Sequence, residues 1–218
     1  MDHDIHNKSA KEISAPKRVF DFIAALCALL VLWPILLIIS IWLRTDSRGP
    51  IFYRGVRTGL NGKPFRIYKF RTMVMDAEKT GGPSTALNDP RLTRIGKFLR
   101  KYKLDELPQL INILIGDMSL VGPRPQVEYY TRSYSDEEKI ILSVKPGLTD
   151  YASIHFIDLD AILGDENVDE KYSREIEPLK NRLRIKYARQ NNFLIDMKII
   201  LMTLTQMFKI KYKWNIKN

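Results

Sequence analysis

Cysteine and histidine are scarce in this sequence, which contains one cysteine, Cys27, and three histidines among 218 residues. A single cysteine excludes an intrachain disulfide and a metal site built from several thiolates, and it fits a reducing, cytoplasmic setting. Strand-like segments are too few for the alternation of strands and helices that a parallel sheet requires. The aromatic and basic stacking motifs of RNA-binding modules are also missing.

Acidic residues are outnumbered by basic ones. The chain has 35 Lys and Arg residues against 25 Asp and Glu, which gives a formal net charge of +10 and a pI near 9.6. Such a basic chain favours a polyanionic partner, which is nucleic acid, an anionic lipid surface or a phosphorylated substrate. Its length allows one soluble domain plus accessory elements.

Long apolar runs are absent except at residues 19–43, where the run is long enough to span a bilayer as one helix. No small-residue cleavage site follows it, so a cleaved signal peptide fits poorly. Basic residues flank the run on both sides, and Pro34 interrupts it near the middle. Because basic flanks prefer the cytoplasmic side and proline bends helices, we predict a re-entrant membrane helix over 17–44 that breaks at Pro34. A single kinked span is the alternative.

Two β-rich stretches, 51–54 and 65–71, flank a turn at 59–62 that contains Asn-Gly, and this pattern predicts a β-hairpin. Lys69 and Arg71 project from one face of its second strand. The two cations are therefore candidates for binding a diphosphate. The alternative is a solvated basic face.

Two acids stand side by side where a helix is expected to begin. Apolar spacing predicts a helix from Glu106 to an end at Gly116, with Asp105 as its N-cap. A carboxylate there faces unpaired N–H groups and the positive end of the helix dipole, so it stays ionised at neutral pH. An ionised carboxylate beside a phosphate site is what a nucleophile attacking phosphorus needs. A plain helix cap is the alternative reading.

Arg124 lies between Pro123 and Pro125, which fix the backbone and present the guanidinium with little entropy to lose. We therefore consider Arg124 a candidate phosphate clamp and the two prolines its support, with a rigid turn and an incidental arginine as the alternative. Residues 193–208 predict a helix with one broad apolar face. That face suits the membrane interface and the protein core equally.

The motifs and their order resemble the bacterial sugar transferase family of monotopic phosphoglycosyl transferases, over roughly residues 17–208. After the membrane helix come YKFRTM at 68–73, LDELPQL at 104–110, GDMSLVGPRP at 116–125, PGLT at 146–149 and FLIDMKI at 193–199. The resemblance implies transfer of a phosphosugar from a UDP-sugar to a polyprenyl phosphate, usually undecaprenyl phosphate. UMP is released, and a covalent aspartyl-phosphosugar intermediate is formed.

The resemblance also implies roles for single residues. Asp105 is the nucleophile, Glu106 is its dyad partner and proton acceptor, and Mg²⁺ lies against Asp105 and the diphosphate. Lys69 and Arg124 occupy positions that the family keeps for function, where they would bind substrate phosphates; Arg71 remains a phosphate-binding candidate from the strand pattern alone. Asp196 would support the site.

We therefore expect a helix-rich α/β fold with a re-entrant membrane helix, a small β-hairpin or sheet, and amphipathic helices at the membrane interface. Residues 1–16 would be a flexible N-terminus, 17–44 the membrane helix, and 45–218 a catalytic domain on the cytoplasmic face of the bacterial inner membrane. The expected partners are a UDP-sugar, polyprenyl phosphate and membrane lipids, and not nucleic acid. No long multi-helix region precedes the membrane helix, as expected of the small form of the family.

The chain departs from the family at DYASIHF, residues 150–156, and at Lys186, where some relatives have an acid. These departures leave the donor sugar open. Two other functions remain: a metal-dependent nucleotide-sugar glycosyltransferase that uses Asp158 and Asp160, and a non-catalytic, membrane-anchored basic module. Release of UMP from UDP-sugars in membranes that contain polyprenyl phosphate discriminates among the three.

Overall fold

The computed structural model describes residues 15–77, 89–157, 159, 162 and 167–207. Helices dominate these residues, and the strands within them form three two-stranded sheets. The helix-rich class predicted from the sequence is therefore confirmed. The pair Asp158 and Asp160, considered above as metal ligands, lies outside the described residues.

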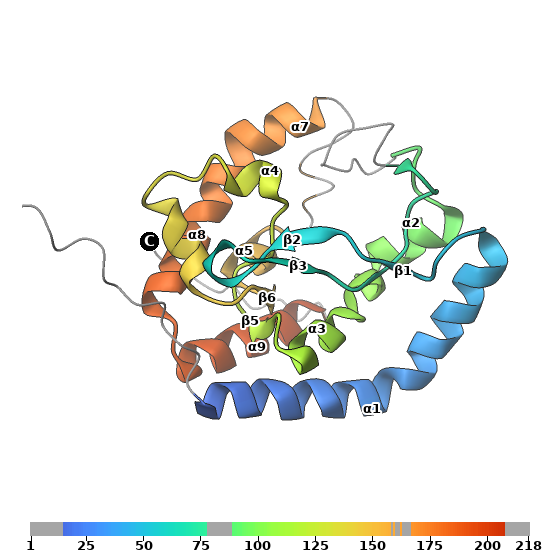
Figure 1. The fold of residues 1–218 in the computed structure, drawn as a ribbon, viewed down its shortest axis with the longest axis horizontal. Coiled ribbons are helices and arrows are strands. Elements are labelled where there is room, and N and C mark those ends of the chain that lie inside the picture. The colour runs from blue at the N-terminus through green and yellow to red at the C-terminus, as the bar shows by residue number, and fades with distance from the viewer. Residues whose placement is uncertain (1–14, 78–88, 158, 160–161, 163–166, 208–218) are drawn as a thin grey trace, which may run out of the picture.

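The first helix, α1 (Ala15–Asp46), has 32 residues, so it is about 48 Å long at 1.5 Å per residue. In the described part of the chain it is the one helix long and apolar enough to cross a membrane. We predicted a break at Pro34, but the backbone stays helical there, and the helix bends near its middle instead (Figure 1). Proline removes only one hydrogen bond, which bends a helix without ending it. The re-entrant course itself stays a prediction.

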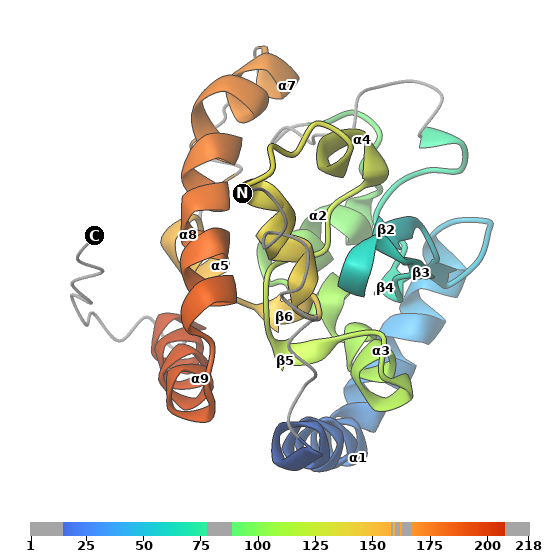
Figure 2. The ribbon, with the colours of Figure 1, turned by 60° about the vertical axis from the view of Figure 1, so that its left-hand side comes forward.

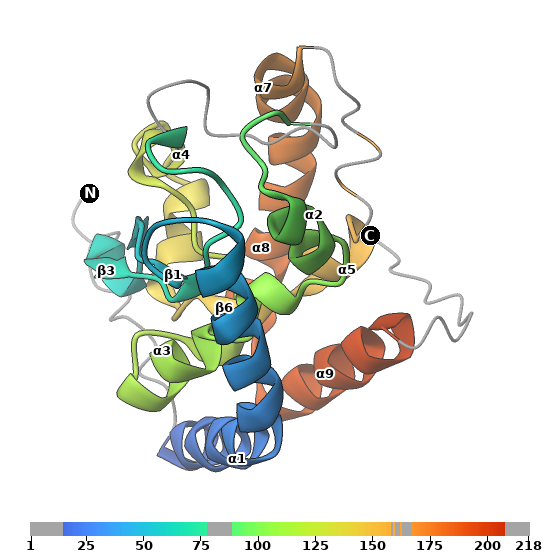
Figure 3. The same cartoon turned by 90° about the vertical axis from the view of Figure 1, so that its right-hand side faces the viewer.

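The bend lets the two limbs of α1 pack against different parts of the chain (Figure 3). The first limb lies along α3 (Gln109–Ile115), and the second rises toward α2 (Arg94–Lys101). The buried cluster around the first limb is Ala25, Ile67, Leu110, Ile113 and Met118. The cluster around the second limb is Ile39, Leu43, Phe70, Ile95 and Leu99. Each fully buried large side chain contributes roughly 1.5–3 kcal/mol, so the two clusters hold the bend in place.

The predicted hairpin is present as two short antiparallel ladders. The strands are β1 (Phe52–Tyr53) with β4 (Lys69–Phe70), and β2 (Val56–Thr58) with β3 (Pro64–Arg66). A 3-10 turn over Leu60–Gly62 joins β2 to β3, and Asn61 adopts a φ of 55° within it. Asparagine tolerates this left-handed conformation better than most residues, so the sequence signal and the observed turn agree.

A parallel pair of strands, which the sequence did not predict, lies beside the hairpin. β5 (Ser119–Val121) pairs with β6 (Gly147–Thr149). A Cβ atom on Gly147 would lie 2.0 Å from the backbone nitrogen of Gly122. The two backbone segments therefore approach this closely only because both positions are glycine.

Helix α9 (Phe193–Met207) packs against this parallel pair, α5 (Tyr151–His155) packs against α9, and α8 (Glu177–Gln190) packs against α5. The remaining helical segments of this half are α4 (Glu128–Thr131), the 3-10 helix η4 (Glu138–Ser143), α7 (Val168–Lys171) and the π-helical turn η5 (Tyr172–Ile176). Helix α7 lies at the opposite end of the molecule from α9 (Figure 2). The main core cluster joins β5, α5, α8 and α9; it consists of Val121, Val144, Tyr151, Ile154, Tyr187, Ala188, Ile199 and Met202.

Helix α9 and the first limb of α1 lie at the same end of the molecule (Figures 1 and 2). The ring of Phe20 meets the ring of Phe193 edge-on, with centroids 5.4 Å apart. Ile199 of α9 is fully buried, whereas Leu194 is 79% exposed and Leu201 is 55% exposed. The apolar face predicted for this helix therefore serves the core on one side. Contact of the exposed side with a membrane stays a prediction.

Candidate active site

Asp105 lies in a 3-10 turn, η3 (Leu104–Glu106), between α2 and α3. The chain turns out of α2 through Lys103, which has a left-handed φ of 57°. We predicted Asp105 as the N-cap of the next helix, and this was wrong: α3 begins at Gln109, preceded by Pro108. An N-cap side chain accepts from the N–H two or three residues later, and Pro108, three residues after Asp105, has no N–H to donate.

The buried carboxylate of Asp105 is paired with Lys69. The Lys69 Nζ lies 2.9 Å from Asp105 Oδ2 and 3.3 Å from Glu106 Oε1, so one cation bridges both acids. Asp105 is 2% exposed, and its Oδ1 has no hydrogen-bond partner among the described residues. The residue predicted as a nucleophile therefore keeps one oxygen uncommitted.

Arg124 faces Glu106 as a two-pronged donor. Its Nη1 donates to Glu106 Oε2 at 2.8 Å, and its Nη2 donates to Oε1. Burial by itself would raise the pKa of Glu106, but the charges of Arg124 and then Lys69 outweigh it and hold the pKa well below its ordinary value. The charge of Glu106 in turn raises the pKa of Arg124. Glu106 is therefore an ionised acceptor at neutral pH.

Asp150 positions Arg124 from behind. Its Oδ2 accepts from the backbone N–H of Arg124 at 3.3 Å, and its Oδ1 accepts from Ser153 N at 2.6 Å, which caps α5. The carbonyl of Pro123 accepts from Gly147 N at 3.0 Å, which ties the same turn to β6. Sequence reasoning noted Asp150 only as a family departure. The available signal was an Asp three residues before a Ser at the start of a short helix.

Arg71 lies apart from this cluster. Its Nη1 donates to the carbonyl of Arg48, and its Nη2 donates to the carbonyl and hydroxyl of Ser47, both at 2.9 Å. The side chain is 6% exposed. Its observed contacts tie β4 to the chain that leaves α1, and binding of phosphate by Arg71 stays a prediction that these contacts do not support.

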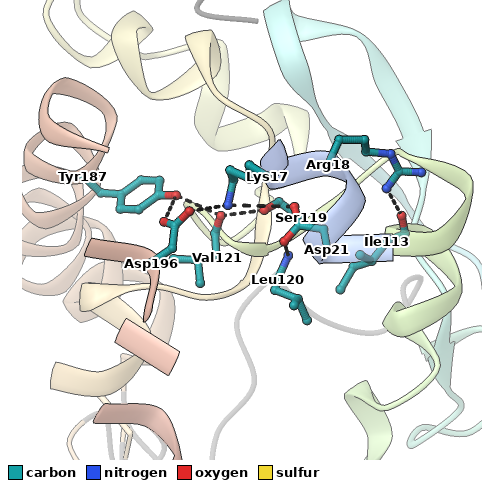
Figure 4. A network of polar contacts seen from close by, with 9 residues as sticks. All are labelled: Lys17, Arg18, Asp21, Ile113, Ser119, Leu120, Val121, Tyr187 and Asp196. Atoms are coloured by element: carbon teal, nitrogen blue, oxygen red, sulfur yellow. Dashed lines mark hydrogen bonds and ion pairs between the residues drawn. The ribbon is translucent and has the colours of Figure 1, made fainter. Parts of the chain in front are cut away.

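Asp196, predicted as a support residue, forms a separate polar network with the start of α1 (Figure 4). Its Oδ2 lies 2.5 Å from Lys17 Nζ, and its Oδ1 lies 2.8 Å from the Tyr187 hydroxyl. Asp21 lies 3.8 Å from the same lysine and accepts from Leu120 N at 3.4 Å. The network therefore fastens α1 to α8, α9 and β5, and it does not touch the Asp105 cluster.

The acids of the site suit a cation that is shared with a substrate. Magnesium in proteins is usually held by one or two carboxylates together with substrate phosphates. Asp105 supplies one carboxylate whose Oδ1 is uncommitted, whereas both oxygens of Glu106 are paired with Arg124. Among the described residues no group of three or more His, Cys, Asp or Glu side chains forms a complete cage. The residues fit magnesium brought in with a diphosphate.

Comparison with known proteins identifies the family of the chain. The sequence model of the family described as "Bacterial sugar transferase" matches residues 12–210. The chain is 37% identical over 196 residues to the UDP-glucose:undecaprenyl-phosphate glucose-1-phosphate transferase of Escherichia coli (strain K12). That alignment covers 88% of this chain and 40% of the relative, so the chain spans two fifths of that protein.

Two further relatives are named for N-acetylgalactosamine instead of glucose. A putative undecaprenyl-phosphate N-acetylgalactosaminyl 1-phosphate transferase of Bacillus subtilis (strain 168) is 44% identical over 133 residues, covering 61% of this chain and 74% of that protein. A UDP-N-acetylgalactosamine-undecaprenyl-phosphate N-acetylgalactosaminephosphotransferase of Aeromonas hydrophila is 35% identical over 162 residues, covering 71% and 38%.

Proposed function

Because the chain belongs to the bacterial sugar transferase family, we propose that it transfers a sugar 1-phosphate from a UDP-sugar to undecaprenyl phosphate and releases UMP. The observation that carries the proposal is the pair of buried Asp105 and partly buried Glu106, held by Lys69 and Arg124. Two carboxylates and two cations in one cluster provide a nucleophile together with donors for phosphate oxygens.

In the first step, Asp105 Oδ1 attacks the β-phosphorus of the donor. A bond forms between this oxygen and phosphorus, and the bond from phosphorus to the oxygen that bridges to UMP breaks. UMP leaves with the electron pair, and the phosphosugar stays on Asp105. Oδ1 suits this role because Lys69 binds the other oxygen of the carboxylate and thereby fixes its orientation.

In the second step, a phosphate oxygen of undecaprenyl phosphate attacks the same phosphorus. The bond to Asp105 breaks, the carboxylate is restored, and a polyprenyl diphosphate sugar is formed. Glu106 accepts any proton that the acceptor phosphate carries, and it does so once Arg124 has turned from Glu106 to the diphosphate, because the paired carboxylate is a weak base.

When the donor binds, Arg124 exchanges Glu106 for phosphate oxygens. Lys69 exchanges only Glu106 and keeps Asp105 Oδ2, because an ammonium has three N–H groups to donate. Magnesium, held by Asp105 and the diphosphate, would neutralise charge on the transferring phosphoryl group. Each lost charge-assisted hydrogen bond to a phosphate costs roughly 1.5–3 kcal/mol, so both cations are expected to matter for rate.

The apolar helix α1 supports a membrane location for this reaction. Both α1 and α9 carry exposed apolar side chains. Helix α9 and the first limb of α1 lie at the same end of the molecule (Figure 2), where these side chains would contact lipid. We place the protein on the cytoplasmic face of the bacterial inner membrane, with α1 re-entrant. This arrangement holds the site at the surface where the acceptor phosphate lies, which raises its effective concentration.

Intact-mass analysis tests the proposal. The purified chain is mixed with Mg²⁺ and, separately, with UDP-glucose, UDP-N-acetylgalactosamine and a wider set of UDP-sugars, without any lipid acceptor. We expect a mass increase of one phosphosugar and one equivalent of UMP with the correct donor. Asp105→Asn should show neither, because its amide cannot form the intermediate. Near-normal turnover by Asp105→Asn would overturn the mechanism.

A further inference from the structure

One buried side chain near Asp105 has no role in the mechanism above. Gln109 is 1% exposed, and neither its Oε1 nor its Nε2 has a hydrogen-bond partner in the part of the chain that the structure describes. Buried amides are nearly always bonded, because an unsatisfied polar group costs about 1–3 kcal/mol. An amide with both ends unpaired therefore indicates a missing ligand.

The position of Gln109 follows from its spacing. The chain from Leu104 to Ile115 follows one right-handed helical path, because Leu107 and Pro108 have helical backbone angles between η3 and α3. On such a path residues spaced i, i+4 and i+7 share one side. Asp105, Gln109 and Asn112 have this spacing, so we call them the polar stripe.

The two ends of the polar stripe show what it faces. Asp105 pairs with Lys69 at 2.9 Å. Asn112 accepts from Tyr68 N at 2.8 Å and donates to the carbonyl of Arg66 at 2.9 Å. The stripe therefore faces the segment 66–69. Gln109 lies between two residues that are bonded to this segment, yet it makes no bond to it.

We propose that Gln109 is a further substrate-binding residue, whose Nε2 donates a hydrogen bond to a non-bridging oxygen of the phosphoryl group that Asp105 receives. This inference rests on the proposed function, because it needs the phosphosugar at Asp105. Lys69 and Arg124 are both committed to carboxylates before the donor arrives, whereas the N–H groups of Gln109 are free of partners among the described residues. A buried donor that is already in place stabilises the negative charge that the equatorial phosphoryl oxygens carry in the transition state.

The test is Gln109→Met, which keeps the length of the side chain and removes its polar atoms. We expect the Tm of the ligand-free protein to stay the same or rise, because an unsatisfied amide has been replaced by a group that needs no partner. The rate of the UMP burst at saturating donor should fall by about 100-fold, as when an oxyanion-hole donor is removed. The donor is whichever UDP-sugar forms the adduct with the wild-type chain.

Asn112→Leu is the matched control, because Asn112 is a buried amide on the same helix whose hydrogen bonds are made within the protein. Its Tm should fall by several degrees. A drop in Tm for Gln109→Met would show that Gln109 is bonded in the resting protein, and a normal burst would show that it does not touch the phosphoryl group. Either result overturns the inference. A wild-type chain that forms no adduct with any donor refutes the proposed function instead.

Discussion

Arg124 and Glu106 meet through two parallel hydrogen bonds, one of them 2.8 Å long between Nη1 and Oε2, so a guanidinium fork closes on a carboxylate fork beside Asp105. Each oxygen of Glu106 accepts from one nitrogen of Arg124, and Lys69 is a further partner of Oε1. A diphosphate that binds Arg124 must therefore separate the two. The exchange is favourable only if the incoming oxygens reproduce the same two-pronged geometry.

The fork geometry makes Arg124→Lys informative. Lysine keeps the charge but presents a single ammonium, so one of the paired hydrogen bonds is lost. We expect the rate of adduct formation to fall at least tenfold, consistent with a loss of roughly 1.5–3 kcal/mol. Arg132→Lys is the control, since Arg132 pairs with Glu128 on the surface and its side chain is 75% exposed. Equal rates for both variants would contradict a two-pronged role for Arg124.

Lys69 and Arg71, two residues apart on the chain, should respond differently to substitution. Lys69→Ala removes the cation that bridges Asp105 and Glu106, so adduct formation per folded molecule should fall at least tenfold. Its Tm should fall as well, because buried Asp105 loses its partner. Arg71→Ala removes three hydrogen bonds to the chain after α1, so its Tm should fall while the rate per folded molecule is kept. A stable, inactive Arg71→Ala would place Arg71 in the phosphate site after all.

Stability should depend on pH through Lys180. This side chain is 6% exposed, and its Nζ lies 5.0 Å from the ring centroid of Tyr172. Burial and then the charge of Arg184 lower the pKa of Lys180 to about 7, from an ordinary value of 10.5. Between these two values the unfolded chain binds more protons than the folded one. The free energy of unfolding should therefore rise with pH in this window, by up to about 1.4 kcal/mol per pH unit.

Chemical denaturation from pH 6 to 10 measures this dependence. Lys180→Met should flatten the rise and increase stability at pH 7, because no charge then needs burial. Lys139→Met is the control, since Lys139 is 65% exposed and should leave the pH profile unchanged. A rise of the same slope in Lys180→Met would assign the pH dependence to other groups.

Cysteine labelling decides the course of α1. In a Cys27→Ser background, Ser9→Cys and Thr45→Cys place one thiol on each side of the apolar run; Thr45 is exposed, and it avoids Ser47, which contacts Arg71. For a re-entrant helix, both thiols should resist an impermeant maleimide in intact cells and react once the inner membrane is opened. Pro34→Ala should favour the spanning form by straightening the helix. If the impermeant maleimide labels Ser9→Cys in intact cells while Pro34 is unchanged, re-entry is contradicted.

Short sequence patterns predicted several elements around the site. The arrangement of its side chains depends on contacts between segments that are distant in the sequence, and these patterns do not predict such contacts. The hairpin turn and the end of α3 at Gly116, with a φ of 97°, were predictable because each depends on a few adjacent residues. Asp105 was identified by its neighbours in the sequence, but its cap role failed because Pro108 removes the N–H that a cap would need. A pattern of apolar spacing does not register that loss.

The remaining features arise from pairings that no short window contains. The β5–β6 pair depends on two glycines, Gly122 and Gly147, which meet only in the folded chain. Asp150 accepts from the backbone N–H of Arg124 only because it directly follows β6, which pairs with β5. The strand pattern gave Arg71 and Lys69 the same expected role. Their contacts differ because the segment that leaves α1 passes beside Arg71 and accepts its hydrogen bonds. Residue spacing alone does not specify these partners.

The paired charges of the ligand-free site should make it a poor binding site for small anions. Lys69 and Arg124 are occupied by Asp105 and Glu106, so a free orthophosphate ion gains little by entering, since it must displace a carboxylate that is already in place. A nucleotide sugar has further contacts with which to offset that displacement. The two carboxylates thus lower the affinity of the site for simple anions and favour a ligand that makes several contacts.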